Sequence, residues 1–201
     1  MRKLIIILDP AHGSDVPGKR SPNGKHLEYR WSREICKALA NKLVANDFRV
    51  EFSNNSEKEI GLSKRVSFAN HLDFNEGEIK FLVSLHNNAA GNGSDWMNAR
   101  GVEIYTSKGS TRSDEFAEVI MKNLKTDFPD NNIVKFRYGN DQLGKEANFS
   151  VLMGSTYYAV LLEWLFQDNK EDYELLQNYQ VNSHLVDSLV KALIEIDDSI
   201  K

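Results

Sequence analysis

Two histidines and two glutamates lie close to where predicted buried strands end or a helix begins. His12 and His86 come shortly after the apolar runs LIIIL and IKFLVSL, and Glu163 follows the run YYAVLL. Glu28 opens an amphipathic helix pattern. Two imidazoles and one carboxylate are a common ligand set of catalytic zinc, which keeps one position open for water. A second carboxylate could accept a proton from that water and later protonate a leaving group.

Each of these residues also has a structural interpretation, which the sequence leaves open. A histidine after a strand is often a hydrogen-bonded structural residue, and Glu28 could simply favour the dipole of its helix. Glu163 could form a salt bridge at the end of its strand, since a buried carboxylate needs a partner. Asp9 fits as the acceptor for the second ring N–H of a metal-bound histidine, or as a turn residue before Pro10.

The remaining histidines and the single cysteine are weaker candidates. His184 lies in a polar stretch of a helix, which predicts a solvated face, and His71 near a helix end fits a capping role. His26 lies in a long loop and fits a rim position better than a metal ligand. Cys36 lies within the helical pattern WSREICKALANKL, which predicts a small buried hydrophobe. A lone cysteine excludes an internal disulfide and a cysteine-based zinc cluster.

The elements that must position the four residues alternate along the chain. The apolar patterns predict strands at Lys3–Leu8, Phe48–Phe52, Ile79–Leu85, Gly101–Thr106 and Tyr157–Leu162. They predict helices at Glu28–Ala45, Leu62–Leu72 with Ser63 as a cap, 112–126, and Glu171–Ile196, the last in one or two pieces. This alternation predicts an α/β fold with a mostly parallel sheet covered on both faces. Sites in such sheets form beyond the carboxyl ends of the strands.

The bulk composition is that of an ordinary globular domain. The chain has 201 residues, of which 41% are hydrophobic, and we expect residues 1–201 to form one domain. Its net charge of -4 gives no electrostatic case for binding nucleic acid. The apolar run near the N-terminus is too short for a signal-peptide core, and no stretch is long enough to span a membrane.

Seven segments, taken in order, resemble the zinc-dependent N-acetylmuramoyl-L-alanine amidases of the Amidase_3 type, which occur in bacterial autolysins and phage endolysins. The segments are ILDPAHG, EYRWSREICKALANKL, LSKRVSFANHLD, FLVSLHNNAA, GVEIY, NFSVL and AVLLEWLFQDNKED. The resemblance covers nearly the whole chain, and its specificity comes from the order of the segments rather than from any one of them.

The resemblance implies a three-layer α/β/α fold and one zinc ion per chain, held by His12, Glu28 and His86. It implies Glu163 as the catalytic acid and base. The reaction would hydrolyse the amide between the lactyl group of N-acetylmuramic acid and the L-alanine of the stem peptide in peptidoglycan. We also expect Arg65 and Asn88 to brace the site or bind substrate, beside Asp9.

Two positions depart from the family pattern, since Ala11 and Tyr158 stand where the family usually has Gly and Pro. The segment Arg137–Ala147 gives no clear match, and substrate selection could lie there. One alternative is a zinc peptidase that cuts within the stem peptide. Another is a non-catalytic cell-wall-binding or regulatory homologue, although the presence of all four site residues argues against inactivation. A serine hydrolase is disfavoured because no Gly-x-Ser-x-Gly elbow is found.

The biological setting follows only in outline from the sequence. A cell-wall hydrolase without a visible signal peptide fits a phage or prophage endolysin made in the cytoplasm, or a bacterial enzyme of the periplasm or cell surface. We expect a monomer. The export route and the preferred stem peptide and glycan are left open.

Overall fold

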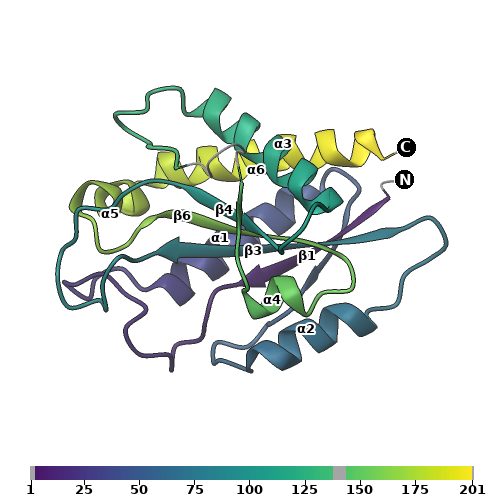
Figure 1. Ribbon diagram of the computed structural model, residues 1–201, viewed down its shortest axis with the longest axis horizontal. Coiled ribbons are helices and arrows are strands. Elements are labelled where there is room, and N and C mark those ends of the chain that lie inside the picture. Colours follow the sequence, from purple (N-terminus) through teal and green to yellow (C-terminus); the bar gives the residue numbers. More distant parts are fainter. Residues whose placement is uncertain (1–2, 138–143, 201) are drawn as a thin grey trace.

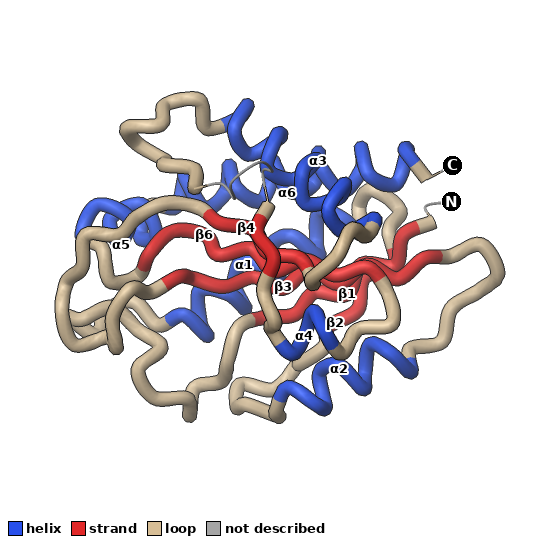
Figure 2. The backbone as a smooth tube through the Cα atoms, viewed as in Figure 1, coloured by secondary structure: helices blue, strands red, loops and turns tan. Residues whose placement is uncertain are grey.

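The computed structural model describes residues 3–137 and 144–200, which form a six-stranded sheet between two layers of helices (Figure 1; Figure 2). The strand order is β2-β1-β3-β6-β4-β5, and neighbouring strands are parallel except β4 and β6, which are antiparallel. The strands are β1 (Leu4–Pro10), β2 (Arg49–Phe52), β3 (Ile79–Asn88), β4 (Glu103–Thr106), β5 (Lys145–Glu146) and β6 (Tyr158–Phe166). The predicted α/β class with a mostly parallel central sheet is confirmed.

The helices divide between the two faces of the sheet. They are α1 (Glu28–Val44), α2 (Leu62–His71), α3 (Arg112–Asp127), α4 (Ser150–Met153), α5 (Lys170–Gln177) and α6 (Tyr179–Ser199). Figure 1 shows α3 and α6 on one side of the sheet and α2 and α4 on the other. The apolar side chains of α1 pack in the same cluster as those of α3 and α6. Among the described residues, none of the helices combines the length and apolarity needed to cross a membrane.

Strand β1, which lies between β2 and β3, is buried along its whole length because its side chains pack in two apolar clusters. Successive side chains of a strand point to opposite faces. Leu4, Ile6 and Leu8 pack in the larger cluster under α1, α3 and α6, and Ile7 packs in the smaller cluster under α2 and α4. This two-sided burial explains the continuous run LIIIL, which is typical of parallel strands covered on both faces.

Two strands run further than the sequence predicted, so that His86 and Glu163 lie inside β3 and β6 rather than after them. The two residues are direct neighbours across the parallel pair. One extra residue then enters β6, because the next paired residues are Asn88 and Phe166. Leu165, in this bulge, has a left-handed φ of 63°. The strands continue because pairing resumes beyond the bulge.

Of the other predicted elements, one agrees with the structure and several differ. The final helical region is two helices, one of the two forms that the sequence allowed, because Asn178 accepts hydrogen bonds from Gln180 N and Val181 N and caps α6. Ser63 does not cap α2; Gly61 takes that position, without a side-chain cap. The sequence missed β5 and α4, which are only 2 and 4 residues long. Of Arg137–Ala147, residues 138–143 lie outside the described residues.

A carboxylate near the C-terminus forms hydrogen bonds with the start of β1. Asp197, fully buried in α6, accepts hydrogen bonds from the backbone N–H groups of Lys3 and Leu4, each at 2.8 Å. These two N–H groups lie at the start of β1, where a buried donor without a partner would be costly. The helix that ends the fold therefore completes its first strand.

Gly13 lies where two loops touch, and we expect Gly13→Ala to destabilise the protein. A Cβ atom there would lie 2.0 Å from Glu59 N and 2.4 Å from Lys58 C, and backbone atoms cannot move aside alone. Overpacking of this kind costs about 1–3 kcal/mol, which urea denaturation would measure. Gly144→Ala is the matched control, because its Cβ would meet only ordinary contacts at 3.7 Å or more. Equal loss in both variants would contradict the prediction.

Candidate metal centre

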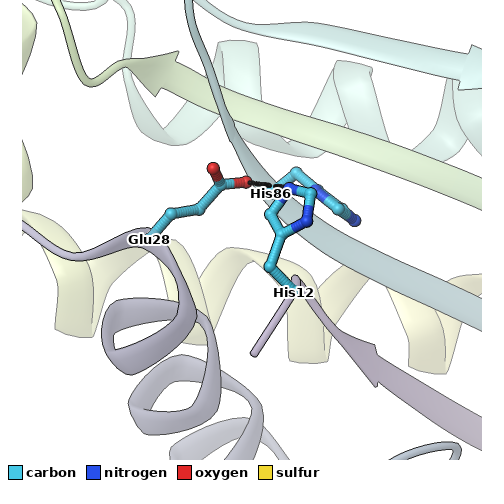
Figure 3. A group of neighbouring side chains, drawn as sticks. All are labelled: His12, Glu28 and His86. Atoms are coloured by element: carbon cyan, nitrogen blue, oxygen red, sulfur yellow. Dashed lines mark hydrogen bonds and ion pairs between the residues drawn. The ribbon is translucent and has the colours of Figure 1, made fainter. Parts of the chain in front are cut away.

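Three of the predicted site residues meet at the carboxyl edge of the sheet. His12 comes from the loop after β1, Glu28 is the first residue of α1, and His86 lies near the end of β3. One ligand atom from each lies within 4.8 Å of the other two. Figure 3 shows Glu28 pointing from the start of α1 toward both imidazoles. In the part of the chain that the structure describes, this is the one His/Cys/Asp/Glu group that could hold a metal ion.

The distances from the Glu28 donor atom to the two histidine donor atoms fit a small tetrahedral ion. Glu28 Oε1 lies 3.5 Å from His12 Nε2 and 3.1 Å from His86 Nδ1. Ligand atoms about 2 Å from a tetrahedral zinc lie about 3.3 Å from one another. Both observed distances are within 0.2 Å of that value. Two nitrogen donors and one carboxylate oxygen also match the ligands that zinc prefers in catalytic sites.

Buried hydrogen bonds hold Glu28 in its ionised form. The side chain is 1% exposed, and Oε1 also accepts from the backbone N–H of Asn87 at 3.1 Å. Oε2 accepts from Gln167 Nε2 at 2.9 Å. Burial alone would raise the pKa of Glu28, but the hydrogen bonds from His12 and His86 bring it well below its usual value. The site therefore presents a carboxylate rather than a carboxylic acid.

Asp9 does not take the predicted position behind a metal-binding histidine. Its carboxylate accepts hydrogen bonds from the hydroxyls of Ser53 and Ser84 and from Arg65 Nη1, the last at 2.8 Å. Its link to His12 runs through Arg65, whose Nη2 donates to the His12 carbonyl oxygen at 3.0 Å. Asp9 belongs to strand β1, and its side chain reaches the partners on its own side of the sheet.

Glu163 lies in the same cleft, which has a volume of about 400 Å³. The cleft is also lined by His12, Glu28 and His86. Within the described residues, the buried Oε2 of Glu163 has no hydrogen-bond partner. Burial raises the pKa of Glu163 to about 7, although the charge of His86 acts to lower it. Glu163 can therefore both accept and release a proton near neutral pH.

The raised pKa of Glu163 predicts that Glu163→Gln stabilises the metal-free protein at alkaline pH. A carboxyl with a folded-state pKa of about 7 and an ordinary value of 4.5 binds more protons when folded. The free energy of unfolding therefore falls as pH rises from 4.5 to 7, by up to about 3 kcal/mol. The glutamine side chain does not ionise, so the free energy of unfolding of the variant does not fall for this reason over the same pH range. Urea denaturation with a chelator should show the variant more stable at pH 8 and equal to the parent at pH 4; parallel pH curves would contradict this.

Asn88 also lines the cleft, and a buried carboxylate orients its side-chain amide. Asn88 Nδ2 donates to Glu103 Oε2 at 2.8 Å. The other oxygen of Glu103 accepts from Arg137 Nε and Lys145 Nζ, each at 2.6 Å. Glu103 therefore fixes the amide of Asn88, which lines the cleft, together with the side chains of Arg137 and Lys145.

Sequence reasoning missed two residues near the centre. Gln167 donates to Glu28 from the segment after β6, and nothing in its local pattern distinguishes it from a surface glutamine. Lys19 lines the cleft, and its charge contributes to lowering the pKa of Glu163 against the effect of burial. Its position in a glycine- and proline-rich loop gives no sequence signal for either contact.

The other histidines have structural contacts, although His26 is buried rather than at the rim position that the sequence predicted. His26 is buried, and its ring bonds to Asn87 Oδ1 at 2.8 Å and to Gln177 Nε2 at 3.0 Å. His71 bonds within its own helix to the Ser67 carbonyl oxygen. His184 is exposed and bonds to the carbonyl oxygen of Asp127, the last residue of α3, at 2.8 Å.

The buried Cys36 offers no alternative nucleophile. It is fully inaccessible on α1, and burial raises the pKa of its thiol far above the usual value. A thiol that stays protonated is a poor nucleophile. This leaves the His12, Glu28 and His86 cluster with Glu163 as the chemically capable group of the cleft.

Known proteins similar to this chain in sequence and in structure are amidases. The N-acetylmuramoyl-L-alanine amidase AmiC of Neisseria meningitidis serogroup B is 26% identical over 212 residues, covering 87% of this chain. The chain spans about half (48%) of that relative's length. An N-acetylmuramoyl-L-alanine amidase from Clostridium difficile 630 has a similar structure, with a TM-score of 0.81, 27% identity and 99% of each chain covered.

A second structure shares the fold at lower identity. The catalytic domain of CwlV, an N-acetylmuramoyl-L-alanine amidase from Bacillus (Paenibacillus) polymyxa var. colistinus, gives a TM-score of 0.78 at 21% identity, with 98% of each chain covered. The sequence pattern of the Amidase_3 family, described as N-acetylmuramoyl-L-alanine amidase, matches residues 6–195. This match covers nearly the whole chain, and the protein therefore belongs to the Amidase_3 family of N-acetylmuramoyl-L-alanine amidases.

Proposed function

We propose that this protein is a zinc-dependent peptidoglycan hydrolase. It cleaves the amide between the lactyl group of N-acetylmuramic acid and the L-alanine of the stem peptide. The observation that carries the proposal is the meeting of the His12, Glu28 and His86 donor atoms within 4.8 Å, in the same cleft as Glu163. Membership of the amidase family supports the choice of bond.

One zinc ion per chain would be held by His12, Glu28 and His86. When bound, zinc lowers the pKa of water toward about 7 and polarises a carbonyl group. Gln167 and the backbone N–H of Asn87 orient the Glu28 carboxylate for this role. Oriented outer partners of this kind tune the affinity of metal ligands.

Glu163 is the proton carrier in this proposal. Its carboxylate accepts a proton from the attacking water and returns it to the nitrogen of the leaving L-alanine. A pKa near neutrality suits both steps, because proton transfer is most efficient when the pKa lies close to the working pH. Asn88, oriented by Glu103, lines the same cleft and is placed to bind the substrate. Arg65 braces the loop that carries His12.

We further propose that residues 1–201 act as one catalytic domain on the bacterial cell wall, in the form of a monomer. Peptidoglycan is its polymeric partner in this proposal. A bacterial autolysin and a phage or prophage endolysin are the two settings that fit such an enzyme.

Product analysis tests the proposal directly. The purified chain is assayed for bound metal by mass spectrometry and incubated with purified peptidoglycan, and new amino ends are labelled and identified. We expect one zinc per chain and new L-alanine amino ends. New amino ends of other residues would indicate a peptidase acting within the stem peptide. No bound zinc, together with no release after zinc is added, would indicate a binding or regulatory homologue instead.

A further inference from the structure

The backbone of His12 is held by two arginines. His12 has a left-handed φ of 47°, which residues other than glycine rarely adopt. Its carbonyl oxygen accepts hydrogen bonds from Arg33 Nη2 at 2.8 Å and from Arg65 Nη2 at 3.0 Å. Two guanidinium groups of like charge thus meet at one carbonyl oxygen. Because these cations repel each other, further bonds must hold each of them in place.

The guanidinium of Arg65 is neutralised by carboxylates. Its Nη1 donates to Asp9 Oδ1 at 2.8 Å and to the carbonyl oxygen of Pro10. Its Nε and Nη2 donate to the two oxygens of Glu59 at 3.1 and 2.9 Å. The side chain is 2% exposed, and its five N–H groups all have partners. Arg65 therefore has the contacts of a buried structural ion pair.

Arg33 has a different set of hydrogen-bond partners, made up only of backbone carbonyl oxygens. Its Nη1 donates to Ala11 and Tyr29, each at 3.0 Å, and its Nη2 donates to His12 and Ser56. Its Nε donates to Ser56 at 3.1 Å. No carboxylate within the described residues forms an ion pair with Arg33. All five N–H groups therefore connect three backbone segments: the loop after β1, the first turn of α1 and the loop after β2.

The position of Arg33 on α1 links the metal-ligating side chains to one rigid element. Glu28 opens the same helix, and Arg33 follows it by little more than one turn. The adjacent Ser32 donates to the carbonyl oxygen of Leu85 at 2.6 Å, directly before His86. Helix α1 thus carries Glu28, binds the backbone beside His86 and binds the backbone of His12.

We propose that Arg33 is a positioning residue of the metal centre: its five hydrogen bonds fix the His12 backbone relative to Glu28 and so set the direction of the His12 imidazole. This inference rests on the proposed metal-binding function of the site. In this inference, an arginine that does not itself bind the metal keeps the His12 imidazole and the Glu28 carboxylate in the right positions relative to each other. Loss of such outer partners weakens metal binding by about 10- to 100-fold.

Binding of cobalt(II) alone tests this role without any enzymatic assay. The visible absorption of bound cobalt(II) reports the geometry of its ligands, and a competing chelator gives the affinity. Arg33→Gln and Arg33→Lys are both tested, since a lysine ammonium cannot reproduce the planar fork of donors. We expect both variants to show an altered cobalt spectrum and an affinity lowered about 10- to 100-fold.

Two controls separate positioning from general stability. Arg30→Gln changes an exposed arginine on the same helix and should leave the spectrum and affinity unchanged. Val186→Ala removes packing in the core at a residue that does not line the cleft, so it should lower the melting temperature without altering the cobalt spectrum.

The outcomes distinguish this inference from the proposed function. If folded Arg33 variants bind cobalt like the parent, Arg33 has no positioning role although the metal site exists. If both variants fail to fold, Arg33 determines the fold rather than the centre, and the inference is also overturned. If the parent itself binds no metal, the proposed function fails first.

Discussion

Replacing Glu163 by glutamine is expected to lower kcat/KM for peptidoglycan by about 10²- to 10⁴-fold, the usual contribution of a general acid–base group. Glutamine has nearly the same shape but cannot take up a proton. Because Glu163 is outside the proposed ligand group of His12, Glu28 and His86, the zinc content should stay at that of the parent. The expected result is therefore a folded, metal-loaded protein that releases few L-alanine amino ends.

Steady-state release of amino ends and the zinc content measure these two properties on the same sample. Glu118→Gln is a suitable control, because it removes one negative charge from an exposed position of α3. It should retain full activity. Parent-like activity of Glu163→Gln would exclude Glu163 as the proton carrier and leave the metal site intact. Loss of zinc in that variant would assign Glu163 to metal binding instead.

Replacing Glu28 by glutamine is expected to weaken zinc binding by more than about 100-fold, which exceeds the effect of losing an outer partner. The substitution removes the only negative charge among the three proposed ligands, and zinc ligands bind in their deprotonated forms. Oε1 of Glu28 lies near both imidazoles, so one altered atom affects the whole cluster. Activity at limiting zinc should disappear with the metal.

Competition with a coloured chelator measures this affinity. Glu34→Gln is the matched control, because Glu34 is an exposed glutamate on the same helix. Its affinity should equal that of the parent. Circular dichroism confirms that the Glu28 variant is folded before its affinity is compared. Unchanged zinc affinity in a folded Glu28→Gln variant would remove Glu28 from the ligand set.

Much of the fold could be predicted because its strands have strong and simple patterns. A run such as LIIIL has no polar residue to place on a solvent face, which is typical of a parallel strand covered on both sides. The carboxyl ends of parallel strands share one edge of the sheet, so His12 and His86 could be expected to lie together. The structure does bring them together, with Glu28 from the following helix.

Contacts made by long side chains could not be predicted in the same way. Arg33 reaches backbone oxygens of two separate loops, and nothing in the helix pattern marks it apart from the exposed Arg30. The predicted partner of Asp9 was wrong because the direction of its side chain depends on the pleat of β1. Glu163 was placed at a strand end because its charge interrupts an apolar run, although pairing with β3 continues past it.

The hydrogen bonds of Asp197 bear on how the chain folds as it is synthesised. The N–H groups of Lys3 and Leu4 are synthesised before their acceptor, which follows 194 and 193 residues later. The start of β1 therefore cannot reach its final state during translation, and the last helix must dock before the first strand is complete. Contacts so distant in sequence are slow to form. The start of β1 in a nascent chain should thus stay exposed to chaperones until α6 has been synthesised and has docked.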